Sequence, residues 1–265
     1  MPRNILFLLL LIVQLPSAQS YHPYETNWGT DGFTLGTAVI VAFSASALDD
    51  KVPKLDAAEI NGLNKQNINS LDRFSAGLYS TSQSKISDVL VGSAILAPVL
   101  FVFDDDVRGD LGTVATMYFE TALFATFLPS YGKGSVQRIR PYVYGSEAPL
   151  SLKIDSDSRR SFFSGHATWA FATSVFFAQV YSDFHPTSEY TNAVWTGAIG
   201  IASTISILRV SSGAHFLSDI VVGAAVGSGI GYLIPYLHRT AMDNVSFVPF
   251  VTHHSSGFAL TIRLK

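Results

Sequence analysis

Six long runs of apolar and small residues leave this chain few folds to adopt. Each run is 16 to 18 residues long, which is too long for an ordinary strand and just under the about 20 residues that a straight transmembrane helix needs. Gly, Ala, Ser and Thr recur in them, and such residues let membrane helices pack closely. We therefore expect an all-α, membrane-associated bundle built on Gly32–Leu48, Ile86–Phe103, Gly112–Leu128, Gly165–Tyr181, Ala193–Leu208 and Ile220–Leu237.

The composition agrees with a membrane location. Hydrophobic residues make up 48% of the chain and charged residues 14%, whereas soluble domains average about 25% charged residues. The formal net charge of -3 indicates no nucleic-acid partner. The absence of Cys excludes disulfides, thiolate zinc sites and cysteine nucleophiles.

The two ends of the chain differ from this pattern. Arg3, the apolar run Ile5–Val13 and Ala18-Gln19-Ser20 together predict a signal peptide over residues 1–20, because they match its charged, apolar and cleavage regions. The alternative is an ordinary first helix. Residues 21–265 are expected to form one domain, which ends in a short β hairpin over Val245–Val251 and Phe258–Leu264.

Two acidic features, a single Glu and a run of three Asp residues, could suggest a catalytic group and a metal site. We favour neither interpretation. Glu120 lies inside an apolar run, so it should face the bundle interior and make a structural hydrogen bond. Asp104-Asp105-Asp106 is interpreted as a solvated turn rather than a metal cluster. No metal site and no cofactor are expected.

The first cluster with chemical potential joins Lys133, Arg140 and Pro141. The Arg guanidinium offers a planar fork of donors to phosphate oxygens, and Lys adds a mobile point charge. Seven residues are about two helical turns, so both side chains are expected on one face of a helix extension. Alone this signal is weak, because basic residues that flank an apolar helix commonly anchor it at the membrane interface.

The second cluster is Ser164-Gly165-His166, directly ahead of an apolar run. Ser is a favoured N-cap residue, and Gly lets the backbone approach an anion at the helix start. His166 in the first turn is placed to give a proton to a leaving oxygen. By itself the cluster is no more than a capping motif.

The third cluster contains Arg209, His215 and Asp219. His215 and Asp219 are four residues apart and share a face of a helix. A carboxylate on one imidazole nitrogen fixes the tautomer and leaves the other nitrogen as a nucleophile. A plain surface pair has the same spacing, so the assignment depends on the other clusters.

Taken together, the clusters supply three cations, a helix start and two histidines, which suits phosphoryl transfer because that reaction depends on positioning and charge stabilisation. The pattern Lys133-x6-Arg140-Pro141, Ser164-Gly165-His166 and Arg209-x5-His215-x3-Asp219 resembles the three-part signature of the type 2 phosphatidic acid phosphatase superfamily. The resemblance covers residues 133–219 and implies a six-helix core.

The resemblance also implies a role for each matching residue. His215 would attack phosphorus, Asp219 would orient it, and His166 would protonate the leaving group. The phosphate oxygens would be bound by Lys133, Arg140, Ser164, Gly165 and Arg209. Two positions depart from the family pattern, since Phe163 replaces its usual Pro and Leu208 its usual Ser; these changes put the loop shape in doubt.

The expected substrate is a phosphate monoester or pyrophosphate on a lipid, with the membrane as the second partner and the oligomeric state left open. A soluble periplasmic acid phosphatase of broad specificity is the nearest alternative. A vanadium-dependent haloperoxidase and a lipid-binding protein without enzymatic activity are alternatives from other classes.

The sequence gives conflicting signals about the membrane face. Similar bacterial enzymes act on the periplasmic face, and we expect a periplasmic site in the bacterial cell envelope. Alternating crossings after a cleaved signal peptide would instead place Lys133 in the cytoplasm. The basic residues of the segment 51–85 favour that second arrangement.

Overall fold

A computed structural model describes residues 22–49, 51–240, 245–251 and 256–262. The predicted signal peptide lies outside these residues. The elements are α1 (Trp28–Asp49), α2 (Ala57–Asn61), η1 (Lys65–Asn67), η2 (Arg73–Ser75), α3 (Thr81–Leu96), η3 (Ala97–Phe103), η4 (Arg108–Asp110), α4 (Leu111–Val136), η5 (Pro141–Tyr144), α5 (Leu150–Lys153), η6 (Ser156–Arg159), α6 (Gly165–Phe184), α7 (Thr191–Ser211), α8 (Leu217–Leu237), β1 (Val245–Val251) and β2 (Ser256–Ile262), where η marks a 3₁₀ helix.

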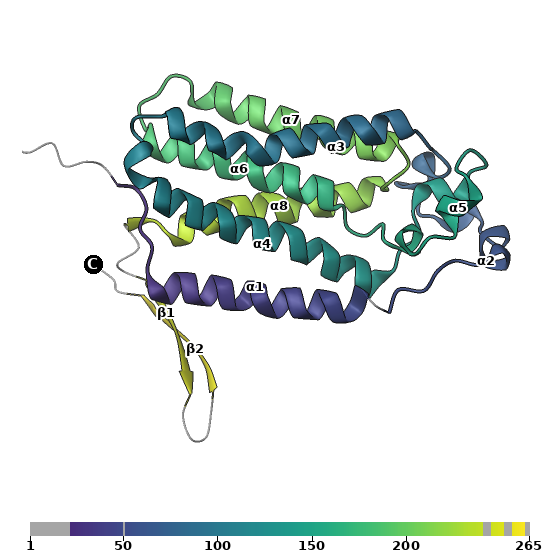
Figure 1. Ribbon diagram of the computed structural model, residues 1–265, viewed down its shortest axis with the longest axis horizontal. Helices are drawn as coiled ribbons and strands as arrows, with labels where there is room; N and C mark the ends of the chain where they lie inside the picture. Colours follow the sequence, from purple (N-terminus) through teal and green to yellow (C-terminus); the bar gives the residue numbers. More distant parts are fainter. Residues whose placement is uncertain (1–21, 50, 241–244, 252–255, 263–265) are drawn as a thin grey trace, which may run out of the picture.

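The predicted all-α bundle is confirmed. The long helices α1, α3, α4, α6, α7 and α8 coincide with the six apolar runs and lie side by side along one axis (Figure 1). Most of them extend beyond the runs, because polar residues complete their first and last turns. The second run is an exception: α3 changes at Ala97 into the 3₁₀ helix η3, whose second residue is Pro98, and proline cannot continue the α-helical hydrogen bonds.

Helix α6 runs through the middle of the bundle, and glycines on α8 bring the two backbones together. A Cβ atom on Gly223, Gly227 or Gly231 would approach a carbonyl oxygen of α6 or of its N-cap residue to 2.7, 2.3 and 2.3 Å, respectively. These three positions are four residues apart and therefore form one stripe along α8. Small residues at this spacing permit close helix packing in membranes, and here they fix the start of α8 against the start of α6.

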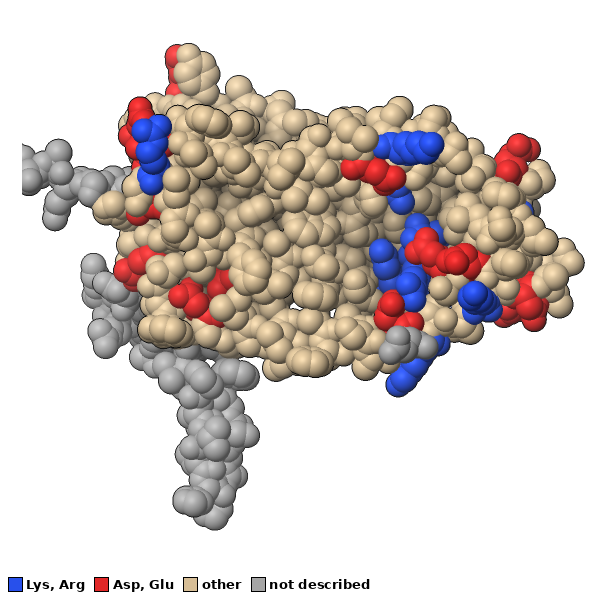
Figure 2. Space-filling view, viewed as in Figure 1, with Lys and Arg blue, Asp and Glu red and all other residues tan. Residues whose placement is uncertain are grey.

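The outer surface of the bundle suits a bilayer. Five helical stretches are long and apolar enough to cross a membrane: Trp28–Asp49, Thr81–Phe103, Arg108–Tyr144, Thr191–Ser211 and Leu217–Leu237. Large apolar side chains such as Phe43 and Ile207 are exposed on their outer faces. Figure 2 shows the charged residues gathered at the two ends, with an uncharged band between them. The structure thus supports a membrane-associated protein.

Two smaller predictions are also confirmed. Glu120 is completely buried within the bundle, as expected of a carboxyl group inside an apolar helix. The backbones of β1 and β2 pair antiparallel, with Val245 opposite Ile262 and Val251 opposite Ser256. The C-terminal hairpin therefore exists, although its second strand begins two residues earlier than predicted.

Candidate active site

Three segments that are far apart in the sequence meet at one end of the bundle, where α4 ends and α6 and α8 begin (Figure 1). Backbone and side-chain contacts join them directly. The Arg140 guanidinium donates from Nη1 to the Ala214 carbonyl at 3.1 Å, and the Ser164 amide donates to the Asp219 carbonyl at 3.1 Å. The Lys133 Nζ atom lies 3.5 Å from the position that a Cβ on Gly165 would occupy. All three sequence clusters therefore contribute to one site.

One expectation about the first cluster was wrong. Lys133 and Arg140 do not share a helical face, because α4 ends at Val136 and Gln137 follows in the left-handed region with φ 50°. Arg140 is in extended backbone, and its amide donates to the Ser158 carbonyl at 2.9 Å. The left-handed C-terminal position is usually Gly or Asn, so a Gln there gives no sequence signal for the helix end.

The turn before His215 depends on Gly213. This residue has φ +73°, and a Cβ atom on it would lie 1.8 Å from the Leu78 carbonyl oxygen. Its own carbonyl accepts from the Tyr142 amide at 3.0 Å. Only glycine combines a positive φ with so close an approach. The turn at Gly213 is thus held between the segments that contain Leu78 and Tyr142. It sets the position of His215, two residues later.

His215 is buried, with 1% of its surface exposed, and its Nδ1 atom donates to the Ser161 carbonyl at 2.7 Å. A carbonyl can only accept, so the proton is on Nδ1 and the lone pair of the neutral ring is on Nε2. The expected hydrogen bond from the His215 ring to the Asp219 carboxylate is not formed, since Asp219 Oδ2 lies 3.9 Å from His215 Nδ1. The backbone of Ser161 occupies that position instead.

Asp219 acts one step away from the ring. Its completely buried carboxylate accepts from the Ser161 hydroxyl at 2.5 Å, from the Phe216 amide at 2.9 Å and from Arg138 Nη1 at 2.5 Å. It therefore holds the residue whose carbonyl binds the imidazole. It also completes the first turn of α8 from its third position.

Arg138 extends this network, which the sequence analysis missed. The guanidinium lies 4.2 Å above the ring centroid of Phe216 and donates from Nη2 to Asp72 at 2.7 Å. Burial raises the pKa of Asp72, but hydrogen bonds from Arg138 and Ser218 outweigh it and hold that pKa below its ordinary value. Arg138 lies between Lys133 and Arg140, so the sequence could have indicated its role. Nothing in the sequence links Asp72 to Arg138.

The three predicted cations surround His215. Burial first, and then the charges of Arg140, Arg209 and Lys133, hold the pKa of His215 well below its ordinary value. The imidazole is therefore neutral at pH 7. Arg140 is further fixed by Asp157, through Nε to its carbonyl and Nη2 to its carboxylate, both at 2.9 Å.

His166 and Arg209 share a carboxylate that the sequence analysis also missed. The Nε2 atom of His166 lies 2.8 Å from Asp88 Oδ1, and Arg209 Nη1 donates to the same oxygen at 3.2 Å. Asp88 comes from α3, which therefore joins α4, α6, α7 and α8 as the fifth long helix that reaches the site. A signal existed, because a charged residue inside an apolar run indicates a functional position.

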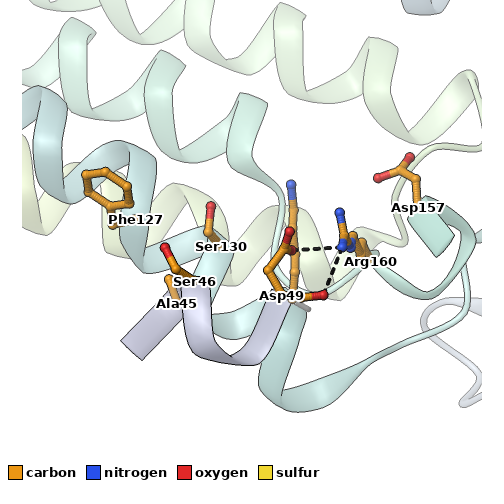
Figure 3. Close-up of a pocket in the computed structure, with 8 residues that line it drawn as sticks. Ala45, Ser46, Asp49, Phe127, Ser130, Asp157 and Arg160 are labelled. Atoms are coloured by element: carbon orange, nitrogen blue, oxygen red, sulfur yellow. Dashed lines mark hydrogen bonds and ion pairs between the residues drawn. The ribbon is translucent and has the colours of Figure 1, made fainter. Parts of the chain in front are cut away.

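A pocket of about 440 Å³ opens beside Lys133, between the end of α1 and α4. Its polar side is formed by Lys133, Arg160 and Asp157, and its apolar side includes Phe127. Figure 3 shows Arg160 joined to Asp49 of α1, through an ion pair of 2.9 Å. The pocket thus reaches from the charged end of the bundle down to an apolar wall.

Comparison with known proteins gives this arrangement a family. The profile of the PAP2 superfamily matches residues 114–243, a range that contains all three clusters. Residues 114–243 belong to the PAP2 superfamily. The resemblance to the type 2 phosphatidic acid phosphatase superfamily is thereby confirmed.

Two individual proteins are similar to part of this chain. The chain is 34% identical over 97 residues to a probable diacylglycerol pyrophosphate phosphatase 1 of Schizosaccharomyces pombe, covering 35% of each chain. It is 25% identical over 141 residues to a lipid A 4'-phosphatase of Porphyromonas gingivalis, covering 53% of this chain and 52% of the other. The matches thus span about half or less of these relatives.

Among solved structures, a transmembrane PAP2-type phosphatidylglycerolphosphate phosphatase from Bacillus subtilis aligns with a TM-score of 0.45 and 19% identity. That alignment covers 78% of this chain and 94% of the other.

Proposed function

We propose that this protein is a phosphatase that removes a phosphate from a lipid through a phosphohistidine on Nε2 of His215. The observation that carries the proposal is the hydrogen bond from His215 Nδ1 to the Ser161 carbonyl. It leaves the lone pair on Nε2, in a ring kept neutral by burial and by Arg140, Arg209 and Lys133. A neutral imidazole among cations suits nucleophilic attack on a phosphate that those cations bind.

In the first step, the Nε2 lone pair attacks phosphorus while the bond from phosphorus to the leaving oxygen breaks. His166 gives that oxygen its proton. Lys133, Arg140 and Arg209 hold the other phosphate oxygens, with the backbone at Ser164 and Gly165 assisting. No metal is among the proposed phosphate ligands, because three side chains supply the positive charge.

In the second step, water attacks the phosphorus of the phosphohistidine and His166 takes a proton from it. The N–P bond breaks, inorganic phosphate leaves, and Nε2 regains its lone pair. The phosphorylated ring carries positive charge, which the Asp219 carboxylate at 3.9 Å and the Ser161 carbonyl stabilise. Asp88, at 2.8 Å from His166 Nε2, orients the proton carrier in both steps.

A lipid substrate is favoured by two observations. The pocket beside Lys133 has an apolar wall at Phe127, in a bundle with membrane-length helices. In addition, the names of the two curated relatives both specify phosphate groups on lipids. The apolar surface also makes a soluble acid phosphatase the weaker alternative.

The decisive experiment uses the full-length protein in detergent with a panel of lipid phosphates. Wild type should release phosphate from at least one member of the panel, vanadate should block the release, and His215→Ala should abolish it. His185→Ala is the matched control, because that histidine pairs with Asp104 at 2.8 Å in the loop before η4, and activity should persist. With ³²P-labelled substrate, rapidly quenched wild type should carry acid-labile label that is absent from His215→Ala, and His166→Ala should slow the departure of the leaving group.

A fully active His215→Ala enzyme would refute the mechanism. Vanadate-dependent oxidation of halide, without phosphate release, would instead identify a haloperoxidase. Tight lipid binding without either activity would identify a binding protein.

We propose further that the site faces the periplasm of a bacterial cell envelope, as similar bacterial enzymes do. Helix α1 runs the length of the bundle (Figure 1), so this requires the residues before Trp28 to be cytoplasmic and conflicts with a cleaved signal peptide. Reporter fusions after Pro141 and after Ser182 test the arrangement, because these residues lie at opposite ends of the bundle. An active external reporter at Pro141 supports the proposal, and a cytoplasmic Pro141 defeats it.

A further inference from the structure

Three metal-ligating side chains converge at the end of the bundle opposite the candidate active site. Asp31 comes from the first turn of α1, Glu120 from α4, and His238 directly follows α8. Their ligand atoms all lie within 4.8 Å of one another. Glu120 is 13 residues before Lys133, which places this cluster about 20 Å from the phosphatase site along α4. The proposed mechanism does not use these residues.

Two of the three ligands, Glu120 and His238, are held in position by groups outside the cluster. The Thr34 hydroxyl donates to Glu120 Oε1, which leaves Oε2 buried and without a hydrogen-bond partner in the described part of the chain. His238 is 1% exposed, and its Nδ1 atom donates to the Ile234 carbonyl at 2.8 Å. This second contact directs Nε2 toward both carboxylates, an arrangement common for metal-bound histidines.

The cluster combines two carboxyl groups with one imidazole. A neutral His238 with its proton on Nδ1 would point a lone pair at Asp31 Oδ1, only 2.9 Å away. If both carboxyl groups are ionised, the completely buried Glu120 and the partly buried Asp31 then carry two negative charges that are expensive to bury. A protonated His238 would compensate one of them. A divalent cation compensates both and also accepts the Nε2 lone pair.

We propose that Asp31, Glu120 and His238 bind one divalent transition-metal ion, with zinc as the preferred ion. Zinc accepts imidazole and carboxylate ligands at about 2.0–2.2 Å in tetrahedral geometry, so neighbouring ligand atoms lie about 3.3 Å apart. The observed separations from His238 Nε2 are 2.9 Å to Asp31 and 3.5 Å to Glu120. The ion would join the start of α1 and the end of α8 to the third turn of α4, and water would take the fourth position.

A second group at the same end of the molecule provides a contrast. Asp104, Asp106 and His185 are also close together, but there each ring nitrogen faces a different carboxylate, at 2.8 Å for Nε2 and 3.3 Å for Nδ1. The two nitrogens of His185 are thus directed at separate carboxylates, whereas the single Nε2 atom of His238 faces both carboxylates of its cluster. This group therefore serves as the control.

The test uses full-length protein purified in detergent with a tag that contains no histidine. Zinc is added after chelation, and bound zinc is measured by mass spectrometry together with the Tm. Wild type and Asp106→Asn should each bind one zinc per chain, with a Tm rise of about 5–10 °C at a hundredfold excess over the Kd. Glu120→Gln and Asp31→Asn should weaken binding by about 100-fold or more.

The proposal is refuted if the wild-type protein binds no zinc, or if its Tm is the same with zinc as with chelator. In that case the three side chains form a cluster that shares protons. Zinc that persists in Glu120→Gln and Asp31→Asn but disappears in Asp106→Asn would move the site to the control group and also refute the assignment. Phosphate release is not part of this readout, so the result is independent of the proposed activity.

Discussion

Replacing Arg140 with lysine tests whether the fork of its guanidinium is needed. The side chain is 5% exposed and makes three hydrogen bonds: to the Asp157 carbonyl and carboxylate at 2.9 Å each and to the Ala214 carbonyl at 3.1 Å. A lysine keeps the charge, but its single nitrogen cannot reproduce the planar fork. The change isolates geometry from charge.

The expected loss follows from those contacts. If the lysine replaces one hydrogen bond and loses two, each worth about 1.5–3 kcal/mol when a charged group takes part, stability should fall by about 3 kcal/mol or more. The Ala214 carbonyl directly precedes His215, so its release also displaces the proposed nucleophile. A misplacement of this kind costs about 100-fold in rate, and we expect kcat/KM to fall by that factor.

The assay combines phosphate release with urea unfolding in detergent. Arg159→Lys is the matched control, because Arg159 pairs with the half-exposed Glu59, and such a surface ion pair contributes only about 0–1 kcal/mol. The reasoning is refuted if Arg140→Lys retains at least half of the wild-type kcat/KM, or if it loses no more stability than the control.

Three further predictions concern protonation and packing. Selective ¹⁵N labelling of histidine should reveal one imidazole signal that stays neutral below pH 6 and is missing in His215→Asn. Protonation of His215 at about the ordinary histidine pKa of 6.5 would contradict burial of the ring among cations. Gly213→Ala should destabilise the fold by about 2 kcal/mol or more in urea unfolding, since φ is positive and a carbonyl blocks the Cβ, whereas Gly197→Ala, with open space around it, should be neutral or stabilising. Asp72→Asn should lower the Tm most at pH 7. Because the pKa of Asp72 is lowered in the folded state, its contribution is present above its unfolded pKa of about 4 and is lost as pH falls further; a Tm difference unchanged at pH 3 would show that the Arg138 contact is not responsible.

The sequence by itself determined the long helices and the set of charged side chains. Apolar runs of this length must bury their backbone hydrogen bonds within a helix, whatever their neighbours are. The spacing of the three clusters likewise identified the family, because it records which chemical groups are present. Where α4 ends was not accessible, since Gln137 has no intrinsic preference for the left-handed conformation that stops the helix.

Only the tertiary structure decided which groups meet. The sequence spacing paired His215 with Asp219, yet the Ser161 carbonyl binds the ring, because α6 and α8 pack closely enough to bring the preceding loop over it. Helix packing also brought Asp88 of α3 to the site. It likewise placed Glu120 close to His238. The local periodicity of a sequence predicts which residues share one face of a helix. The distances between helices depend on how those faces pack, and that packing is a property of the whole chain.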